Sequence, residues 1–228
     1  MISFFARFIG LVLLLALLGR AQPLPGAATN LTVENSGRVV THANVASRFV
    51  PARRVDVWLP PGYAATASGR YPVIYMHDGQ NLFDPATTFG GVPWSVDLAM
   101  LRLIAAGRTS GAIIVGIWNA GMERDLEYMP QKDLPGAFVQ FSHGTPDQPI
   151  TRLRSDAYLK FLVEELKPFI DRTYRTKPDA PNTFVMGSSM GGLISAYALA
   201  EYPQVFGGAG CVSTHLPAGD GALIGYLA

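Results

Sequence analysis

The sequence predicts an α/β fold, with a mostly parallel sheet that carries helices on both faces. Continuous apolar runs recur along the chain, helical patterns lie between them, and the two alternate from Tyr71 to Ser213. Strands that are buried on both faces have such unbroken apolar runs, and their alternation with helices is typical of parallel sheets. The 228 residues are 49% hydrophobic and 15% charged, which suits one sizeable domain with a buried core.

The expected strands fall into two groups. Two early segments, 38–47 and 53–60, alternate partially and have no helix between them, so we expect them to pair antiparallel at one edge of the sheet. The later strands are predicted from apolar runs, which occupy 71–76, 112–119, 182–187 and 206–213.

Helices are expected between the later strands. The first runs from Ser95, a good N-cap residue, to Gly107, a typical C-terminal stop. The second covers 155–174 with apolar residues at helical spacing, and Pro168 is expected to kink or end it. A short apolar helix follows Ser189.

The N-terminus resembles an export signal. Arg7 precedes a short apolar run at 8–18, and Gly19 and Ala21 are the small residues that a signal peptidase reads. We therefore predict a signal peptide over 1–21; retention as a single membrane anchor is the alternative.

Beyond the signal, we expect a flexible mature start at 22–36 and one catalytic-type domain over 37–228. The predicted location is outside the cytoplasm, either periplasmic or secreted. No stable membrane span is expected after signal cleavage.

Composition argues against several classes of function. The net charge is +1, from 18 basic and 17 acidic residues, so no nucleic-acid partner is expected. The chain contains no metal-ligand cluster, phosphate-binding glycine loop or dinucleotide fingerprint, and we expect neither a metal nor a cofactor. Cys211 is the single cysteine, which we expect to be a small buried residue.

The most informative stretch is GSSMG, Gly187–Gly191. It joins a buried strand to an apolar helix, which is the setting of a nucleophile elbow. The turn is so tight that glycines two residues to either side avoid clashes, and the strain lifts the Ser189 hydroxyl above the sheet. Ser188 precedes the centre of the turn. The alternative is an ordinary glycine–serine turn that caps a helix.

A second stretch, 75–84, follows the third strand and has the position of an oxyanion-binding loop. We predict that the backbone N–H groups of Met190 and Gln80 form the oxyanion site, aided by the positive end of the following helix. His77 and Asp78 are expected to shape this loop through hydrogen bonds and not to act directly.

Four motifs together resemble the esterase family of the α/β-hydrolase superfamily. They are PVIYMHDGQNLFD, GVPWSVD, RDLEYMP and GSSMGG, and the resemblance runs from about Val39 to the C-terminus. Relatives in this family include enterochelin esterase-like proteins, feruloyl and acetylxylan esterases, and mycolyltransferases. The resemblance implies an α/β-hydrolase fold and an acyl-serine intermediate, with Ser189 as nucleophile and the N–H groups of Met190 and Gln80 around the oxyanion.

The rest of a catalytic triad is hard to find. This fold orders its triad as nucleophile, acid and histidine, yet after the strand at 206–213 only His215 and Asp220 remain. His215 comes about two strands too early for the family pattern, and Asp220 looks like a turn or a helix start. We therefore expect a C-terminally incomplete domain with its last strands, acid and base beyond Ala228, an exposed edge strand and impaired activity.

Two other histidines are poor substitutes for the base. His42 lies before the core, and His143 lies in an insertion-like loop. His215 as a replacement base stays open as an alternative.

Substrate contacts are expected from two loops. Trp94, Phe83 and Phe89 are placed to line an acyl or sugar pocket, although they could instead pack the first helix on the sheet. The substrate-binding candidates after the fourth strand, where ligands of α/β sheets bind, are Asn119, Arg124 and Tyr128. The alternative there is a solvated loop in which Arg124 pairs with Asp125 or Glu127. Residues 136–149 are a candidate lid.

The predicted function is that of a serine carboxylic-ester hydrolase. Its expected substrate is a carbohydrate ester or a small-molecule ester such as that of a siderophore. An acyltransferase of the same family and a noncatalytic ligand-binding scaffold remain the alternatives.

Overall fold

The computed structural model describes residues 36–64, 68–132, 134, 136–142 and 145–228. All of them belong to one compact unit, Leu31–Ala228. The expected signal peptide, its cleavage site and His143 lie outside the described residues. In the described part of the chain, no helix combines the length and the apolarity needed to cross a membrane.

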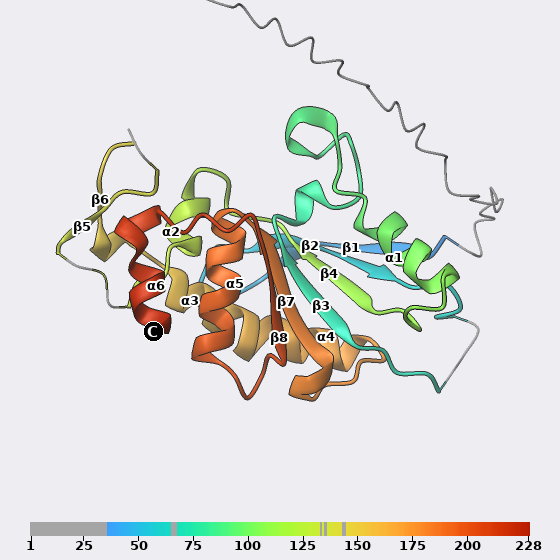
Figure 1. Ribbon diagram of the computed structural model, residues 1–228. Coiled ribbons are helices and arrows are strands. Elements are labelled where there is room, and N and C mark those ends of the chain that lie inside the picture. Colours follow the sequence, from blue (N-terminus) through green and yellow to red (C-terminus); the bar gives the residue numbers. More distant parts are fainter. Residues whose placement is uncertain (1–35, 65–67, 133, 135, 143–144) are drawn as a thin grey trace, which may run out of the picture. The chain divides into compact units, whose positions relative to one another are not determined.

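A six-stranded sheet forms the centre of this unit (Figure 1). Its strands lie in the order β1-β2-β4-β3-β7-β8. The first pairings, β1 with β2 and β2 with β4, are antiparallel, whereas β4–β3, β3–β7 and β7–β8 are parallel. The six strands correspond to the six predicted segments: β1 (Arg38–Val45), β2 (Arg53–Leu59), β3 (Val73–His77), β4 (Ile113–Ile117), β7 (Thr183–Ser188) and β8 (Gly208–Val212).

Helices and short turns connect the strands. A separate two-stranded ribbon, β5 (Phe138–Val139) with β6 (Gln148–Pro149), lies in the candidate lid. The α-helices are α1 (Val96–Ala105), α2 (Arg124–Tyr128), α3 (Ser155–Lys160), α4 (Lys167–Thr173), α5 (Met190–Glu201) and α6 (Ala222–Leu227). The shorter helical turns are η2 (Gly79–Asn81), η3 (Phe89–Gly91), η4 (Gly121–Glu123), η5 (Ile150–Arg152), η6 (Phe161–Leu166), η7 (Ala180–Asn182) and η8 (Ala218–Gly221).

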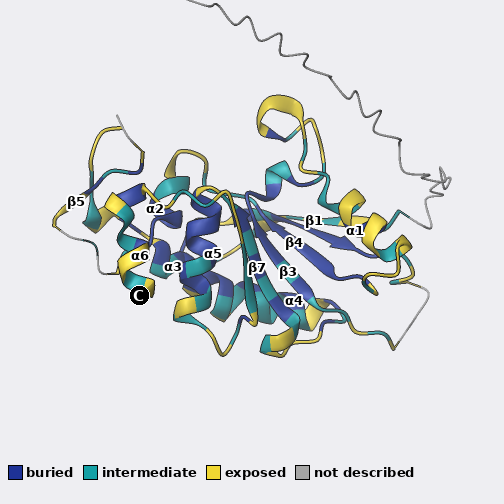
Figure 2. Ribbon diagram, in the orientation of Figure 1, coloured by how far each residue is buried: buried dark blue, intermediate teal, exposed yellow. Residues whose placement is uncertain are grey.

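Strand periodicity divides the core between the two faces of the sheet. In β3, Val73 and Tyr75 belong to the larger apolar cluster, whereas Met76 points into the smaller one, because successive side chains alternate across a sheet. Helices α3, α4 and α5 complete the larger cluster, and α1 completes the smaller one. Figure 2 shows the central strands mostly buried beneath these helices. The predicted arrangement, with helices on both faces, is confirmed.

Helix α1 begins and ends where the sequence predicts, but its start is built differently. Ser95 occupies the N-cap position with φ 52°, and its side chain makes no capping hydrogen bond. The hydroxyl instead donates to the carbonyl of Pro93. At the other end Gly107 has φ 65°, and the next N–H, of Arg108, donates to the carbonyl of Leu103 at 2.9 Å. This left-handed glycine ends the helix as predicted.

Pro168 neither ends nor interrupts the long helical segment. The π-helical turn η6 lies between α3 and α4, and Pro168 stands in the first turn of α4. A proline removes one N–H and crowds the carbonyl four residues earlier, and a π-turn widens the helix at that point. The segment therefore continues to Thr173.

Strand β8 lies at the edge of the described sheet and pairs only with β7. Val212 is 44% exposed and Cys211 is exposed. The expectation that Cys211 is buried is therefore wrong. An apolar neighbourhood in sequence buries a strand residue only where other elements cover it, and within the described residues no strand flanks β8 on its outer side.

Candidate active site

Ser189 occupies a strained turn between β7 and α5. Its backbone angles are φ 58° and ψ −120°, a region that residues with a side chain rarely adopt. Such a conformation costs about 1–3 kcal/mol and persists only where the surroundings enforce it. Ser189 is exposed, while its neighbours Gly187 and Met190 are buried. The turn thus presents one hydroxyl to solvent at the carboxyl end of a central strand.

Backbone hydrogen bonds from three directions hold this turn. The N–H of Ser189 donates to the carbonyl of Val212 in β8 at 3.0 Å. The Ser189 carbonyl accepts from the N–H of Gly192 at 2.9 Å and from that of His215 at 3.2 Å. The strained residue is therefore tied to the edge strand, to the first turn of α5 and to the segment after β8.

The glycines of the motif have different roles. A Cβ on Gly187 would lie 2.6 Å from the carbonyl carbon and oxygen of Gly191, and one on Gly192 would lie 2.5 Å from Oγ1 of Thr214. A Cβ on Gly191 would meet nothing nearer than 3.5 Å, which is an ordinary contact. Glycine is thus needed for space at 187 and 192, whereas the expected crowding at 191 is absent. The atoms nearest to a Cβ on Gly191 belong to His77 and Asp78, at the end of β3 and in the loop after it.

The loop after β3 lies against the first turn of α5. Strand β3 ends at His77, Asp78 adopts φ 58° and ψ 46°, and the turn η2 carries Gln80. A Cβ on Gly191 would lie 3.5 Å from both His77 Cβ and Asp78 Oδ2, so the loop packs against the first turn of α5. Figure 1 shows β3 and β7 ending side by side at this point.

Helix α5 begins at Met190, directly after Ser189. The first N–H groups of a helix have no acceptor within the helix, and together they form its positive end. The N–H of Met190 therefore belongs to a group of donors suited to a developing negative charge.

A buried ion pair anchors the loop. The Asp78 side chain, 3% exposed, accepts two hydrogen bonds from Arg124, Nε to Oδ1 and Nη2 to Oδ2, both at 2.7 Å. Asn119 Nδ2 donates to Asp78 Oδ1 at 2.7 Å, and the Asp78 N–H donates to the Tyr128 hydroxyl at 3.3 Å. Burial acts to lower the pKa of Arg124, but the hydrogen bonds and charge of Asp78 outweigh it and raise that pKa. Asp78 thus shapes the loop, in accord with the sequence-based expectation.

His77 lies beneath the loop with no exposed surface. Its Nδ1 is 2.8 Å from the hydroxyl of Tyr158, and its Nε2 has no partner. Burial lowers the pKa of His77 to about 3, so the ring is neutral near pH 7. A second buried ion pair, Arg53 with Glu127, has both bonds at 2.7 Å.

No base reaches the Ser189 hydroxyl in the part of the chain that the structure describes. The Ser189 hydroxyl makes no hydrogen bond there to any histidine or carboxylate. His215 Nε2 lies 2.9 Å from the carbonyl oxygen of Phe141 and 3.3 Å from Ser142 Oγ, so a proton on this nitrogen serves that carbonyl. Asp220 lies in the turn before α6 with φ 54°. His215 and Asp220 therefore form no relay with Ser189 here.

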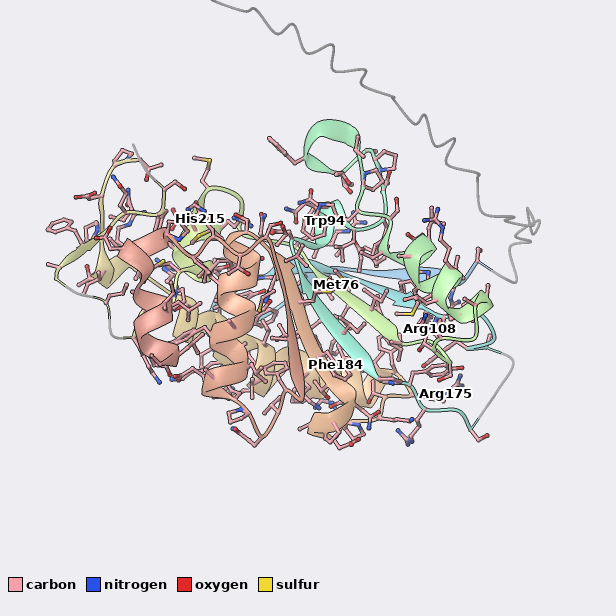
Figure 3. The ribbon with its side chains drawn as sticks, in the orientation of Figure 1. Met76, Trp94, Arg108, Arg175, Phe184 and His215 are labelled. Atoms are coloured by element: carbon pink, nitrogen blue, oxygen red, sulfur yellow. The ribbon has the colours of Figure 1, made fainter. Side chains whose placement is uncertain are left out.

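The predicted substrate-binding residues differ in what they present to solvent. Trp94 is 39% exposed and Phe89 92% exposed, while Phe83 packs against the smaller apolar cluster. In Figure 3, Trp94 and His215 lie toward the end of the sheet at which β3 and β7 end.

Among the candidates after β4, Asn119 and Arg124 are half-buried and both bind Asp78. Tyr128 has no exposed surface, so its contribution is to support the loop. The expected alternative is confirmed in part, because Arg124 Nη1 also donates to Asp125 Oδ1 at 3.0 Å. Sequence reasoning missed the Asp78–Arg124 pair, which joins residues 46 positions apart.

The sheet order, the helices on both faces and the strained serine between strand and helix define an α/β-hydrolase fold. Residues 47–221 match the family model described as "Putative esterase". The chain therefore belongs to this esterase family.

Relatives of known sequence and structure are consistent with that assignment. The chain is 26% identical over 161 residues to YbbA of Bacillus subtilis, covering 71% of this chain and 56% of that protein. It is 29% identical over 167 residues to an endo-1,4-beta-xylanase/feruloyl esterase of Xylanibacter ruminicola, covering 71% and 20%. An IroE-like serine hydrolase from Shewanella oneidensis superimposes with a TM-score of 0.59 at 25% identity, covering 78% and 51%. The chain thus spans only part of each relative.

Proposed function

We propose that this protein hydrolyses carboxylic esters and that Ser189 is its nucleophile. The observation that carries the proposal is the strained, exposed Ser189, which stands between a central strand and the amide-rich start of α5. Membership of the esterase family supports the reaction class.

In the proposed reaction, the Ser189 oxygen attacks the ester carbonyl carbon, and its proton passes to a base, which returns it to the departing alkoxide. The N–H groups of Met190 and Gln80 bind the oxyanion, the alcohol leaves, and water then releases the acid from the acyl-serine. A serine without a base is a weak nucleophile, and none of the described residues supplies one. We therefore expect slow turnover from this chain alone.

The proposed substrate is an ester carried on a carbohydrate or a siderophore. The similarity to the Xylanibacter relative, an endo-1,4-beta-xylanase/feruloyl esterase, supports the carbohydrate class. The exposed Trp94 and Phe89 suit the apolar part of such a substrate, and Asn119 is the proposed polar contact. Arg124, a second candidate from the sequence, has its guanidinium group bound to Asp78. Export to the periplasm or medium is proposed from residues 1–21.

The test is covalent labelling of the folded chain with a fluorophosphonate probe, followed by mass spectrometry of the labelled peptide. We expect labelling at Ser189, its loss in Ser189→Ala, and its retention in Ser188→Ala, the matched control one residue earlier. Hydrolysis of p-nitrophenyl acetate should follow the same order. Added alcohol or sugar acceptors separate a hydrolase from an acyltransferase, because only a transferase shifts product from free acid to new ester.

The second candidate is a noncatalytic ligand-binding scaffold, favoured by the lack of a base near Ser189 among the described residues. A folded sample that binds ester analogues, yet neither takes up the probe nor cleaves the acetate, would support this candidate against the esterase.

A further inference from the structure

We propose that Arg124 is a positioning residue that compensates the charge of Asp78 beside the oxyanion site. Its guanidinium group neutralises a buried carboxylate that would otherwise oppose the negative charge developing on the substrate. This inference rests on the proposed esterase function and adds to it a role for a residue that need not touch the substrate.

The position of the Asp78 carboxylate makes compensation necessary. Its side chain is 3% exposed, and its Oδ2 would lie 3.5 Å from a Cβ on Gly191, in the first turn of α5. Gly191 directly follows Met190, whose N–H is a proposed oxyanion donor. An anion buried this close to the site repels a second anion strongly, because little water screens the two charges.

Arg124 has the geometry to cancel that charge. It binds both carboxylate oxygens at 2.7 Å, a forked contact that lysine cannot reproduce. The guanidinium carbon also lies 4.9 Å from the centre of the Tyr128 ring, which keeps it in place. The side chain is 23% exposed, so the pair is shielded from most of the solvent.

The same contacts hold the loop in shape. Asp78 has a left-handed backbone conformation directly before η2, the turn that carries the Gln80 N–H. Asn119 also links Asp78 to Gln80, because its side chain donates to Asp78 and its backbone N–H donates to Gln80 Oε1 at 3.3 Å. The Asp78–Arg124 pair therefore governs both the charge and the orientation of this half of the oxyanion site.

Direct contact between Arg124 and substrate is the competing explanation, and a charge-rescue experiment separates the two. Removing one partner of a buried ion pair leaves an uncompensated charge, whereas removing both leaves none. If Arg124 acts through Asp78, neutralising Asp78 must restore what the loss of Arg124 takes away. If Arg124 binds substrate directly, Asp78→Asn restores nothing.

The experiment measures kcat and KM for p-nitrophenyl acetate and the rate of fluorophosphonate labelling in the full chain. We expect Arg124→Gln to lower kcat and the labelling rate about 10²-fold, comparable with the loss of one oxyanion donor, and KM to change less than about threefold. The double variant Asp78→Asn/Arg124→Gln should recover at least about tenfold. Arg152→Gln, which removes the same charge from an exposed pair with Glu123, is the matched control and should stay close to wild type.

Several results would overturn the inference. They are an Arg124→Gln variant as fast as wild type, or a folded double variant no faster than Arg124→Gln. If Arg124→Gln does not fold, the double variant decides by itself, because it leaves no uncompensated buried charge: a rate within about tenfold of wild type supports compensation, and a folded double variant about 10²-fold slower contradicts it. A wild-type chain inert to both probes overturns the proposed function and this inference with it, whereas a reactive wild type with an unaffected Arg124→Gln overturns the role of Arg124 alone.

Discussion

The motif glycines give a testable prediction, because Gly187 and Gly191 lie two residues before and after Ser189 yet have different surroundings. In Gly187→Ala the added carbon would lie 2.6 Å from the carbonyl carbon and oxygen of Gly191 and 2.8 Å from its Cα. These distances are about 1 Å shorter than an ordinary contact between carbon atoms. The opposing atoms are backbone at the start of a buried helix, so the clash cannot be relieved by turning a side chain.

The expected cost follows from this geometry. Overpacking a core typically costs about 1–3 kcal/mol, and a clash with fixed backbone belongs at the upper end, so we expect Gly187→Ala to lower the free energy of unfolding by about 3 kcal/mol. For a domain of this size that corresponds to a fall in Tm of about 6–12 °C. In Gly191→Ala the added carbon meets nothing nearer than 3.5 Å. That variant should remain within about 1 kcal/mol of wild type, because alanine also favours the helix.

The assay is urea unfolding followed by far-UV circular dichroism, with Tm measured on the same three proteins. Equal midpoints for Gly187→Ala and wild type would refute the argument from steric contact. So would a Gly191→Ala variant that is destabilised as much as Gly187→Ala, since the two positions would then be equivalent in spite of their different surroundings.

Three further predictions concern buried and exposed side chains. Burial lowers the pKa of His77 to about 3, so between about pH 3 and pH 6.5 the unfolded chain binds a proton that the folded chain does not. The free energy of unfolding should therefore fall by up to about 1.4 kcal/mol per pH unit on acidification through this range. In His77→Gln, the free energy of unfolding measured in urea should depend less steeply on pH. Arg53→Met breaks the ion pair with Glu127, whose two side chains are 4% and 1% exposed, and should lower the free energy of unfolding in urea by about 3–5 kcal/mol. The double variant Arg53→Met/Glu127→Leu should regain most of this loss, and a double variant as unstable as Arg53→Met would contradict the prediction. Cys211 is exposed, so one thiol per chain should react with Ellman's reagent without denaturant, and a thiol that reacts only after unfolding would show that β8 is covered.

Local patterns predicted most of the architecture. Unbroken apolar runs gave the positions of the strands, since a strand buried on both faces needs apolar residues at every position. The two-residue strands β5 and β6 escaped prediction, because so short a segment carries no periodicity. The antiparallel neighbours of β2 on both sides also depend on which segments meet, and only the first of these pairings was expected.

The candidate site also combines features that the local sequence predicts with features that it does not. The position of Ser189 follows from five consecutive residues, because a tight strand-to-helix turn requires a particular local sequence. The exposure of Cys211 and the burial of Tyr128 could not be predicted locally, since each depends on which elements cover the residue.

By itself, the sequence determined an α/β chain with a serine at a strand-to-helix turn, because strand burial and turn strain are set by neighbouring residues. Only the tertiary structure decided that Arg124 neutralises Asp78, that Gly187 and not Gly191 is sterically required, and that β8 stands at the edge of the described sheet. The physical reason is that charge pairing, close contact and solvent exposure depend on distances between segments that lie far apart along the chain.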